Sequence, residues 1–375
     1  MPEIREAALN IQATGWLTNM AVVMATLIGS PANAAAAAVA RIPVRVVVVT
    51  TFELGADSGD TPGEFQYWVE RIPLTETLPF PAGLHALRYN AQKHILGIVV
   101  GSGSINSSAS IMALGLDARF DLSHAYWLVA GIAGINPNKG SVGSAAWAEW
   151  IVDRDLTHEI DAREIPKDWS TGLVPLTRNR PFQNPPPAPG IFSPNVYHLN
   201  HGLVNWAYGF TVSTALADSA NLQSIRARYT DQPEAMRPPH VMKGDEVSAN
   251  SWWVGALMNR AAEDWMTYWT GGMGASVMTA MEDCGVMRAL QMLSQTHRVD
   301  TQRVLVLRTA ANYSAPPAGQ TAAEFLESES STDSATHLSA FLPSLESAYR
   351  VGSPVVQELS SHWDSYAFRI PSASP

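Results

Sequence analysis

RVVVVT, residues Arg45–Thr50, is a continuous β-branched run that follows Pro43. A strand that is buried on both faces, as in a parallel sheet, has this pattern. The run LGIVV at Leu96–Val100 repeats it and leads into a Gly-Ser turn at Gly101–Ser104 and a small-residue helical stretch at Asn106–Leu116. This succession of strand, turn and helix predicts an α/β fold.

The same alternation continues along the chain. AYWLVA at Ala125–Ala130 predicts a third strand, which is followed by a turn at Gly131–Gly134. Ala146–Val152 predicts a fourth strand. Arg303–Leu307 predicts a last strand after a helix-like stretch at Met278–Ser294. Strands that alternate with helices in this way indicate a sheet covered by helices.

The composition is that of a globular chain, with 375 residues, 46% hydrophobic and 15% charged. The formal net charge of -10 argues against a nucleic-acid partner, which requires a basic surface. Cys284 is the one cysteine, so no intrachain disulfide can form. No segment from residue 42 to residue 375 resembles a linker between separate cores, and these residues are predicted to form one domain.

Residues 1–41 have a different character. Trp16–Ala40 has an apolar core followed by small residues, with Ala-Asn-Ala at Ala32–Ala34. This pattern is typical of a secretory signal peptide, although Arg5 is the only cation before the apolar core. A disordered alanine-rich leader and a membrane anchor are the alternatives. We expect a periplasmic or secreted protein whose mature chain has no run of about 20 apolar residues that could span a bilayer.

Five segments together resemble the purine nucleoside permease family, a branch of the nucleoside phosphorylase superfamily. They are Phe52–Phe65 (FELGADSGDTPGEF), Ala113–Pro137, Gly143–Trp150 (GSAAWAEW), Thr279–Gly285 (TAMEDCG) and Val306–Gly319 (VLRTAANYSAPPAG). The resemblance implies a nucleoside-phosphorylase-like three-layer α/β sandwich with a mixed, twisted central sheet. It also implies a purine nucleoside as ligand and cleavage of its N-glycosidic bond.

The resemblance places a ribose site at Met281 and Glu282, where superfamily members have a Met-Glu pair. An ionised carboxylate is an acceptor-only group, which suits the 2′- and 3′-hydroxyls of the sugar. Asn312 stands where relatives have an Asp or Asn beside the purine N7. An Asn donates a hydrogen bond there but cannot protonate the base, which favours 6-oxopurines. The neighbouring Asp283 is a second candidate for the acid.

Trp252 and Trp253 end a stretch that resembles the superfamily segment over base and sugar. Stacking of an aromatic ring on a purine contributes about 1–3 kcal/mol. Because adjacent residues of a strand point to opposite faces, only one of the pair is expected to face the ligand. Core packing of both rings is the alternative.

The loops after the first two strands indicate whether phosphate or water accepts the sugar when the glycosidic bond is cleaved. Phosphorylases of the superfamily have an arginine in each loop, and this chain has Val100 where the second arginine is expected. The turn at Gly101, Ser102 and Gly103 instead resembles that of the superfamily's nucleosidases, in which an acid after the first strand activates water. Glu53 is in that position, so the sequence favours hydrolysis over phosphorolysis.

Two alternatives to a catalytic Glu53 stay open. Asp57 or Asp60 of the same loop could be the acid, or Glu53 could form a structural ion pair with Arg71 or Arg88. A carboxylate in this loop would repel phosphate and could serve as a general base.

Signals for other chemistries are missing. The chain has no Cys/His cluster with zinc spacing, no P-loop and no G-x-S-x-G motif, so neither a metal nor a cofactor is expected, apart from phosphate as the alternative co-substrate. The second functional hypothesis is an exported nucleoside-binding protein that serves uptake without turnover, and the third is a scaffold without a working site. Homo-oligomers are common in the superfamily, and the sequence leaves the oligomeric state open.

Overall fold

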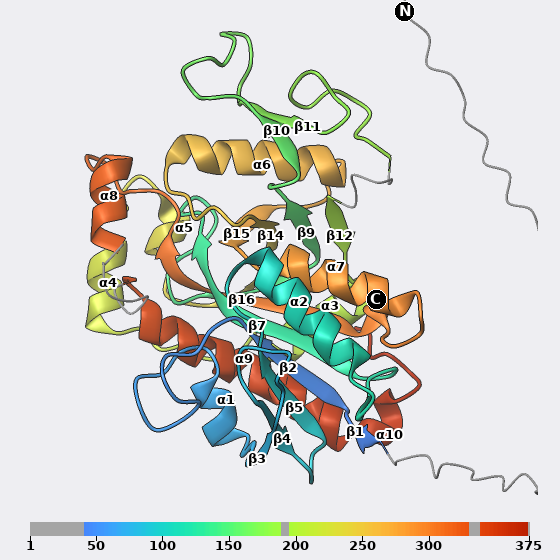
Figure 1. Ribbon diagram of the computed structural model, residues 1–375. Helices are drawn as coiled ribbons and strands as arrows, with labels where there is room; N and C mark the ends of the chain where they lie inside the picture. Colours follow the sequence, from blue (N-terminus) through green and yellow to red (C-terminus); the bar gives the residue numbers. More distant parts are fainter. Residues whose placement is uncertain (1–40, 189–194, 330–337, 374–375) are drawn as a thin grey trace, which may run out of the picture. The chain divides into compact units, whose positions relative to one another are not determined.

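The computed structural model describes residues 41–188, 195–329 and 338–373 (Figure 1). The leader predicted at residues 1–41 lies outside the described residues, apart from Arg41. In the described ranges, no helix combines the length and the apolar composition that a bilayer crossing requires.

A 12-stranded mixed sheet forms the centre of the described chain. Its main path runs in the order β12 (Val196–His198), β9 (Trp150–Asp153), β14 (Asp245–Ser248), β15 (Ser276–Ala280), β7 (Tyr126–Ile135), β2 (Val46–Thr50), β5 (Ile95–Val99), β4 (Leu87–Asn90) and β3 (Glu76–Leu78). A branch leads from β7 through β16 (Val304–Tyr313) and β8 (Ala145–Ala148) to β13 (Val241–Lys243). Two small sheets pair β1 (Ile42–Pro43) with β6 (Phe120–Asp121) and β10 (Thr157–Glu159) with β11 (Leu173–Pro175).

The run RVVVVT forms β2, as the sequence predicts. β2 lies between β5 and β7 and is parallel to both, and all five of its residues are buried. Both faces of β2 are therefore inside the protein, which explains its unbroken β-branched sequence.

Three predicted boundaries are wrong. Gly131–Gly134 is not a turn, because β16 pairs with β7 along its length and holds it extended to Ile135. Ala146–Val152 is two strands, since the Asp245 carboxylate accepts hydrogen bonds from the Glu149 and Trp150 N–H groups (2.9 and 2.8 Å) and interrupts the strand there. Met278–Ser294 is not one helix: its first residues belong to β15, which pairs with β14 and β7, and α7 starts only at Asp283.

Helices cover both faces of the sheet (Figure 1). On one face α2 and α7 pack against each other, and on the other α9 packs on β7 and β16 beside α1 and α3. The three-layer α/β sandwich with a mixed sheet is confirmed. The helices are α1 (Gln66–Arg71), α2 (Gly103–Leu116), α3 (His201–Thr211), α4 (Ala220–Arg226), α5 (Pro233–Met236), α6 (Ala256–Thr270), α7 (Asp283–Ser294), α8 (Ala322–Glu329), α9 (Phe341–Ser361) and α10 (Trp363–Tyr366).

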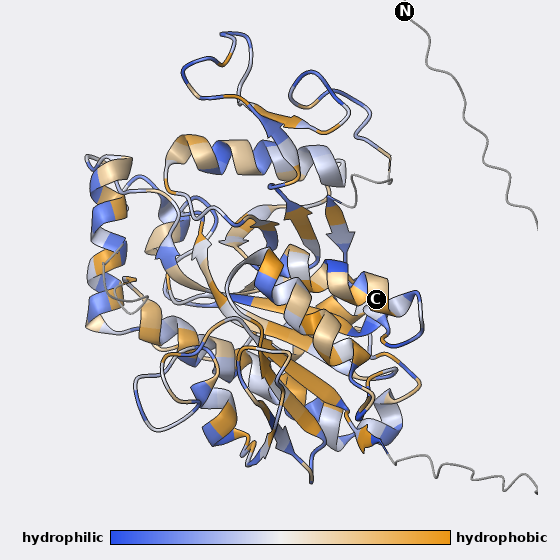
Figure 2. Cartoon of the chain, in the orientation of Figure 1, coloured by the Kyte–Doolittle hydropathy of each residue, from blue (hydrophilic) through white to orange (hydrophobic). Residues whose placement is uncertain are grey.

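Apolar residues concentrate on the central strands, and polar residues on the outer helix faces (Figure 2). The main core includes β2, β5 and β7 and the fully buried side chains of Trp68 and Trp127. The core also contains buried charged side chains, and several of them lie close to the carboxyl ends of the central strands.

Candidate active site

A cavity of about 310 Å³ lies where the segments after β2, β5, β14 and β15 meet the carboxyl-terminal parts of β7 and β16. Ligands of open α/β sheets bind at the carboxyl ends of the strands, and this cavity has that position. Its lining consists of Thr51, Phe52, Glu53, Leu54, Glu64, Ser102, Ile132, Ala133, Gly134, Ser251, Trp252, Thr279, Ala280, Met281, Glu282, Asn312 and Leu338.

The charged groups of this lining are all acidic. Among the described residues, the lining includes the carboxylates of Glu53, Glu64 and Glu282 and no Lys, Arg or His. The local potential is therefore negative and favours neutral or cationic ligands over anions.

Glu64 is a buried carboxyl group at the wall of the cavity, with 5% of its surface exposed. One of its oxygens accepts hydrogen bonds from the Thr51 N–H and hydroxyl (2.6 and 2.7 Å), and the other accepts one from the Ile132 N–H (2.7 Å). Burial raises the pKa of Glu64 to about 7, partly offset by the nearby Arg308 guanidinium and reinforced by Glu282. A carboxyl group with this pKa can both take up and release a proton near neutral pH.

Arg308 on β16 lies behind the cavity wall and is 1% exposed. Its guanidinium donates to both oxygens of Asp283 (2.8 Å each), to Glu282 (3.1 Å) and to the Ile132 carbonyl (3.1 Å). Burial alone would lower the pKa of Arg308, but Asp283 and Glu282 raise it above its ordinary value. Arg308 thus makes four hydrogen bonds to this chain's own groups, and its bond to Glu282 keeps that carboxylate in a fixed orientation.

Gly131 on β7 makes room for this cluster. A Cβ atom at Gly131 would collide with the Arg308 guanidinium and with the Glu64 carboxylate. The Gly131–Gly134 segment is therefore a strand with small residues where the charged side chains cross it, which is why its sequence resembles a turn.

Glu246 on β14 adds another carboxylate to the cluster. It is fully buried, and one of its oxygens lies 3.7 Å from Arg308 Nε. Among the described residues neither of its oxygens has a hydrogen-bond partner. Arg308 is thus the shared partner of buried carboxyl groups from several segments. Asp283 and Glu282 accept its hydrogen bonds, Glu246 lies 3.7 Å away, and its charge partly offsets the raised pKa of Glu64.

The predicted ribose residues lie together in the cavity. Met281 and Glu282 are both in the lining, and Glu282 is 5% exposed. The Glu282 carboxylate accepts a hydrogen bond from the Gly103 N–H (3.1 Å) at the start of α2. Gly103 and Gly101 both have positive φ (85° and 87°), which shapes the turn around Ser102, and the Ser102 side chain lines the cavity.

Asn312 and Asp283 have different surroundings. Asn312 lines the cavity, and its amide donates to the Tyr313 carbonyl (2.8 Å), which leaves one N–H and the amide oxygen for a ligand. Asp283 is fully buried, bonded to Arg308 and outside the lining. The structure therefore gives Asp283 a position from which it orients Arg308.

Glu53 lies in the lining, but its carboxylate is occupied. Its oxygens accept hydrogen bonds from the backbone N–H groups of Leu54, Gly63, Phe65 and Gln66. It closes the loop between β2 and α1 and satisfies the first N–H groups of that helix. Of the alternative acids, Asp57 pairs with His85 (3.1 Å) and Asp60 accepts from the Ala56 N–H (2.9 Å).

The two tryptophans point to different environments. Trp252 lines the cavity and is partly exposed. Trp253 is 6% exposed, belongs to the same core cluster as Trp265 and has the Arg154 guanidinium 5.5 Å from its ring. Of this pair, Trp252 is the ring available to a ligand in the cavity.

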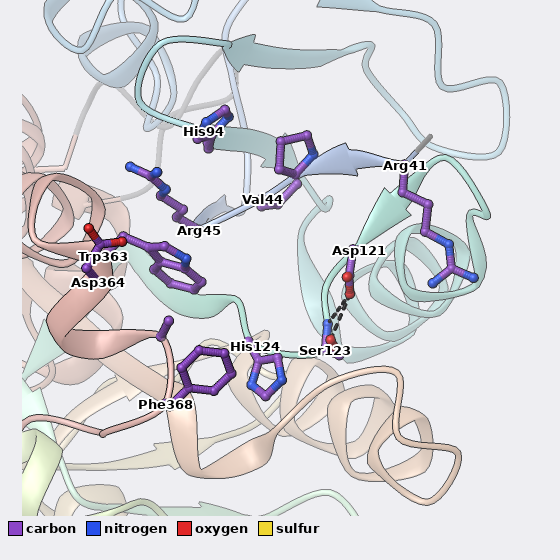
Figure 3. A pocket seen from close by; sticks show the side chains of 12 residues that line it. Arg41, Val44, Arg45, His94, Asp121, Ser123, His124, Trp363, Asp364 and Phe368 are labelled. Atoms are coloured by element: carbon purple, nitrogen blue, oxygen red, sulfur yellow. Dashed lines mark hydrogen bonds between the residues drawn. The ribbon is translucent and has the colours of Figure 1, made fainter. Parts of the chain in front are cut away.

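A second cavity of about 630 Å³ lies at the other end of β2 (Figure 3). There the Arg45 guanidinium lies 5.9 Å from the Trp363 ring, and His124 meets Phe368 edge to face at 5.4 Å. Phe368 is 86% exposed, and the cavity adjoins the amino ends of β2 and β7. Because ligand sites of such sheets lie at the carboxyl ends, we place the functional site in the first cavity.

Sequence reasoning missed Glu64 and Arg308 as site residues. The only signal for Glu64 was an acid directly before the apolar run Phe65–Val69, where burial is to be expected. Arg308 is the one cation in the otherwise uncharged run VLVLRTAA (residues 304–311), a position that requires buried carboxylate partners.

The fold and the cavity define an α/β protein with an acidic small-molecule site at the carboxyl ends of its strands. The profile of the family described as "Purine nucleoside permease (NUP)" matches residues 43–371. The chain therefore belongs to the purine nucleoside permease family.

Curated relatives have the same description. A "probable purine nucleoside permease" of Schizosaccharomyces pombe is 29% identical over 279 residues, which cover 73% of this chain and 78% of the relative. A "purine nucleoside permease" of Candida albicans is 26% identical over 273 residues, which cover 72% of this chain and 65% of the relative.

Among solved structures, the chain is similar to 5′-methylthioadenosine/S-adenosylhomocysteine nucleosidases. The enzyme from Neisseria meningitidis has a TM-score of 0.46 and 13% identity, with 84% of this chain and 99% of that chain covered. The enzyme from S. pneumoniae has a TM-score of 0.46 and 12% identity, with 85% and 100% covered.

Proposed function

We propose that this protein cleaves the N-glycosidic bond of purine nucleosides and that water is the acceptor. The observation on which the proposal rests is Glu64, a buried carboxyl group with a pKa of about 7 at the wall of an otherwise acidic cavity. Family membership supports the ligand class.

In this mechanism Glu64 is the general base. As the bond between C1′ and the base breaks, the bonding electrons leave with the purine and the sugar acquires oxocarbenium character. The water oxygen forms the new bond to C1′ and one of its protons passes to Glu64, while the departing purine anion takes up a proton from solvent. Because Glu64 is half ionised near pH 7, it can accept this proton and release it to solvent after the reaction.

The electrostatics of the cavity favour water over phosphate. A phosphate dianion would meet Glu53, Glu64 and Glu282 without a cation in the described lining to offset them. Arg308, the guanidinium closest to these groups in the described chain, is already bonded to Asp283 and Glu282. We therefore infer hydrolysis, with phosphorolysis as the alternative that the assay must test.

Other lining residues hold the substrate. We assign the ribose hydroxyls to Glu282, whose orientation is set by Arg308 and the Gly103 N–H. Asn312 donates its free amide N–H to the purine, and Trp252 stacks on the base or sugar. These contacts fix C1′ beside Glu64, which lowers the entropic part of the barrier.

Nucleoside uptake without turnover is the second candidate function, and it is favoured by the description of the family and its relatives as permeases. Both functions use the same cavity and differ in whether the nucleoside is recovered unchanged.

We also propose, from residues 16–40, that the chain is exported. N-terminal sequencing of the protein from its native host tests this proposal: a cleaved leader supports export, and an intact leader contradicts it.

The test is to incubate the purified full chain with inosine, guanosine and adenosine, with and without phosphate, and to separate base from nucleoside by chromatography. Equal rates of base release in both conditions, with free ribose as co-product, support hydrolysis. Base release that requires phosphate contradicts it. Tight binding with the nucleoside recovered intact supports the uptake function instead.

A further inference from the structure

Glu246 on β14 is a buried carboxyl group to which the proposed mechanism gives no role. None of its surface is exposed, and neither of its oxygens has a hydrogen-bond partner among the described residues. β14 pairs with β9 on one side and with β15 on the other, so Glu246 lies in the interior of the sheet. Burial of a carboxylate without hydrogen bonds is costly, and an opposite charge nearby offsets that cost.

Arg308 is the opposite charge that the structure places beside Glu246. A Glu246 oxygen lies 3.7 Å from Arg308 Nε. The Nε–H of Arg308 already donates to Asp283 (2.8 Å), so the contact with Glu246 is an ion pair without a hydrogen bond. Glu246 therefore acts on Arg308 through its charge alone.

A different nitrogen of the same guanidinium lies close to Glu64. A Cβ atom at Gly131 would collide with both Arg308 Nη1 and Glu64 Oε1, so these two atoms are near each other. Arg308 lowers the pKa of Glu64, against the burial that raises it to about 7. One guanidinium is thus shared between Glu64 at the cavity wall and Glu246 outside the lining.

Two other acids are bonded to this guanidinium. Asp283 accepts two hydrogen bonds from Arg308 and Glu282 accepts one, and the charge of Glu282 also raises the pKa of Glu64. Removal of either side chain would break a hydrogen bond of Arg308 and let the guanidinium move. The charge of Glu246 can be removed without the loss of any hydrogen bond in the described chain, which separates its electrostatic effect from a structural one.

The charged groups of the neighbouring elements bond elsewhere. Asp245 on β14 and Asp153 on β9 accept hydrogen bonds from backbone N–H groups, as Glu53 does before α1. Arg288, the one cation of α7, is exposed and donates to Gln291. β7, β15 and α2 contain no charged residue. Arg308 is therefore the group through which Glu246 can affect Glu64.

We propose that Glu246 is a positioning residue that acts through Arg308: it offsets part of the guanidinium charge and so leaves Glu64 able to hold and release a proton near neutral pH. This inference rests on the proposed function and extends it to a residue outside the cavity lining. Without the negative charge of Glu246, the site would favour ionised Glu64 more strongly. The carboxylate would then be a weaker base toward water at neutral pH.

The test measures kcat/KM for inosine as a function of pH in the wild type, E246Q, E246M and E246D. E246Q and E246M both remove the charge, and methionine needs no hydrogen-bond partner, so a folded variant is available if glutamine is not tolerated. A unit charge roughly 10 Å away, at an effective dielectric constant of about 20, changes a pKa by about one unit. The rise of kcat/KM should therefore move about one pH unit lower in E246Q and E246M. E246D, which keeps the charge, and E70Q, which removes an exposed acid of α1, should retain the wild-type profile.

Urea unfolding gives a second readout that needs no activity. The difference in stability between each form and the same form with E64Q, measured from pH 4 to pH 9, isolates the titration of Glu64. In the wild type this difference should change up to about pH 7, and in E246Q or E246M it should level off about one unit lower. Folded E246Q or E246M whose profile coincides with that of E70Q, in kinetics or in unfolding, overturns the proposal. If no form releases base, the proposed function fails, and the unfolding series still decides the role of Glu246.

Discussion

Glu64→Gln is the substitution that separates the proposed mechanism from a purely structural site. Glutamine keeps the size of the side chain and its acceptor oxygen for the Thr51 or Ile132 N–H, but it cannot take a proton from water. Loss of a general base lowers turnover by about 10²- to 10⁴-fold. In the wild type, kcat/KM should rise with pH and level off above about pH 7, where Glu64 is ionised.

E64Q should also change the way in which the free energy of unfolding depends on pH. The pKa of Glu64 is 4.5 in the unfolded chain and about 7 in the folded one, so between these values the unfolded state loses its proton first. The free energy of unfolding therefore falls as pH rises from 4.5 to 7, and the full shift corresponds to about 3 kcal/mol. E64Q lacks this contribution, so its stability relative to the wild type should improve as pH rises from 5 to 8.

Urea unfolding at pH 5 and pH 8, with steady-state kinetics on the same preparations, measures both effects. E70Q on α1 is the matched control, because Glu70 is exposed and lies outside the cavity lining. If E64Q retains activity within a fewfold of the wild type, Glu64 is not the general base. If its stability changes with pH as that of the wild type does, the pKa of Glu64 is not raised by folding.

Three further substitutions test the substrate contacts. E282Q should lower kcat/KM by two orders of magnitude or more, because the carboxylate is the acceptor for the ribose hydroxyls; a loss of only a few fold would place the sugar elsewhere. W252A should raise KM by roughly 5- to 150-fold, the equivalent of about 1–3 kcal/mol of stacking, while W253A should mainly lower the melting temperature; the reverse result would exchange their roles. N312D should shift preference toward adenosine, since an acid can protonate N7, and an unchanged inosine-to-adenosine ratio of kcat/KM would separate Asn312 from the base.

Secondary structure was predictable from the sequence where burial alone determines the residue pattern. β2 is apolar on both faces because it is buried on both faces, so its sequence alone identifies it. The failure at Gly131–Gly134 has the opposite cause. Gly131 leaves room for Arg308 and Glu64, which come from other segments, and nothing in the local sequence indicates that contact.

Some residues of the candidate site were predictable from the sequence, and others were identified only from the structure. Glu282, Met281 and Asn312 were recognisable because the resemblance to the family fixes their order along the chain, and the structure places all three in one cavity. The choice between Glu53 and Glu64 could not be made from the sequence. Both acids lie between β2 and α1, and only the hydrogen bonds show that Glu53 closes the loop while Glu64 faces the buried cluster.

The sequence by itself determined the α/β class and the family, because strand burial and family motifs are properties of contiguous residues. The tertiary structure alone decided which carboxyl group titrates near neutral pH. A pKa depends on burial and on charges that distant segments bring within a few ångströms, as Arg308 and Glu282 do for Glu64. The start of α2 gives a second example, because the Ser104 N–H donates to the amide oxygen of Asn250, which is 146 residues away along the chain.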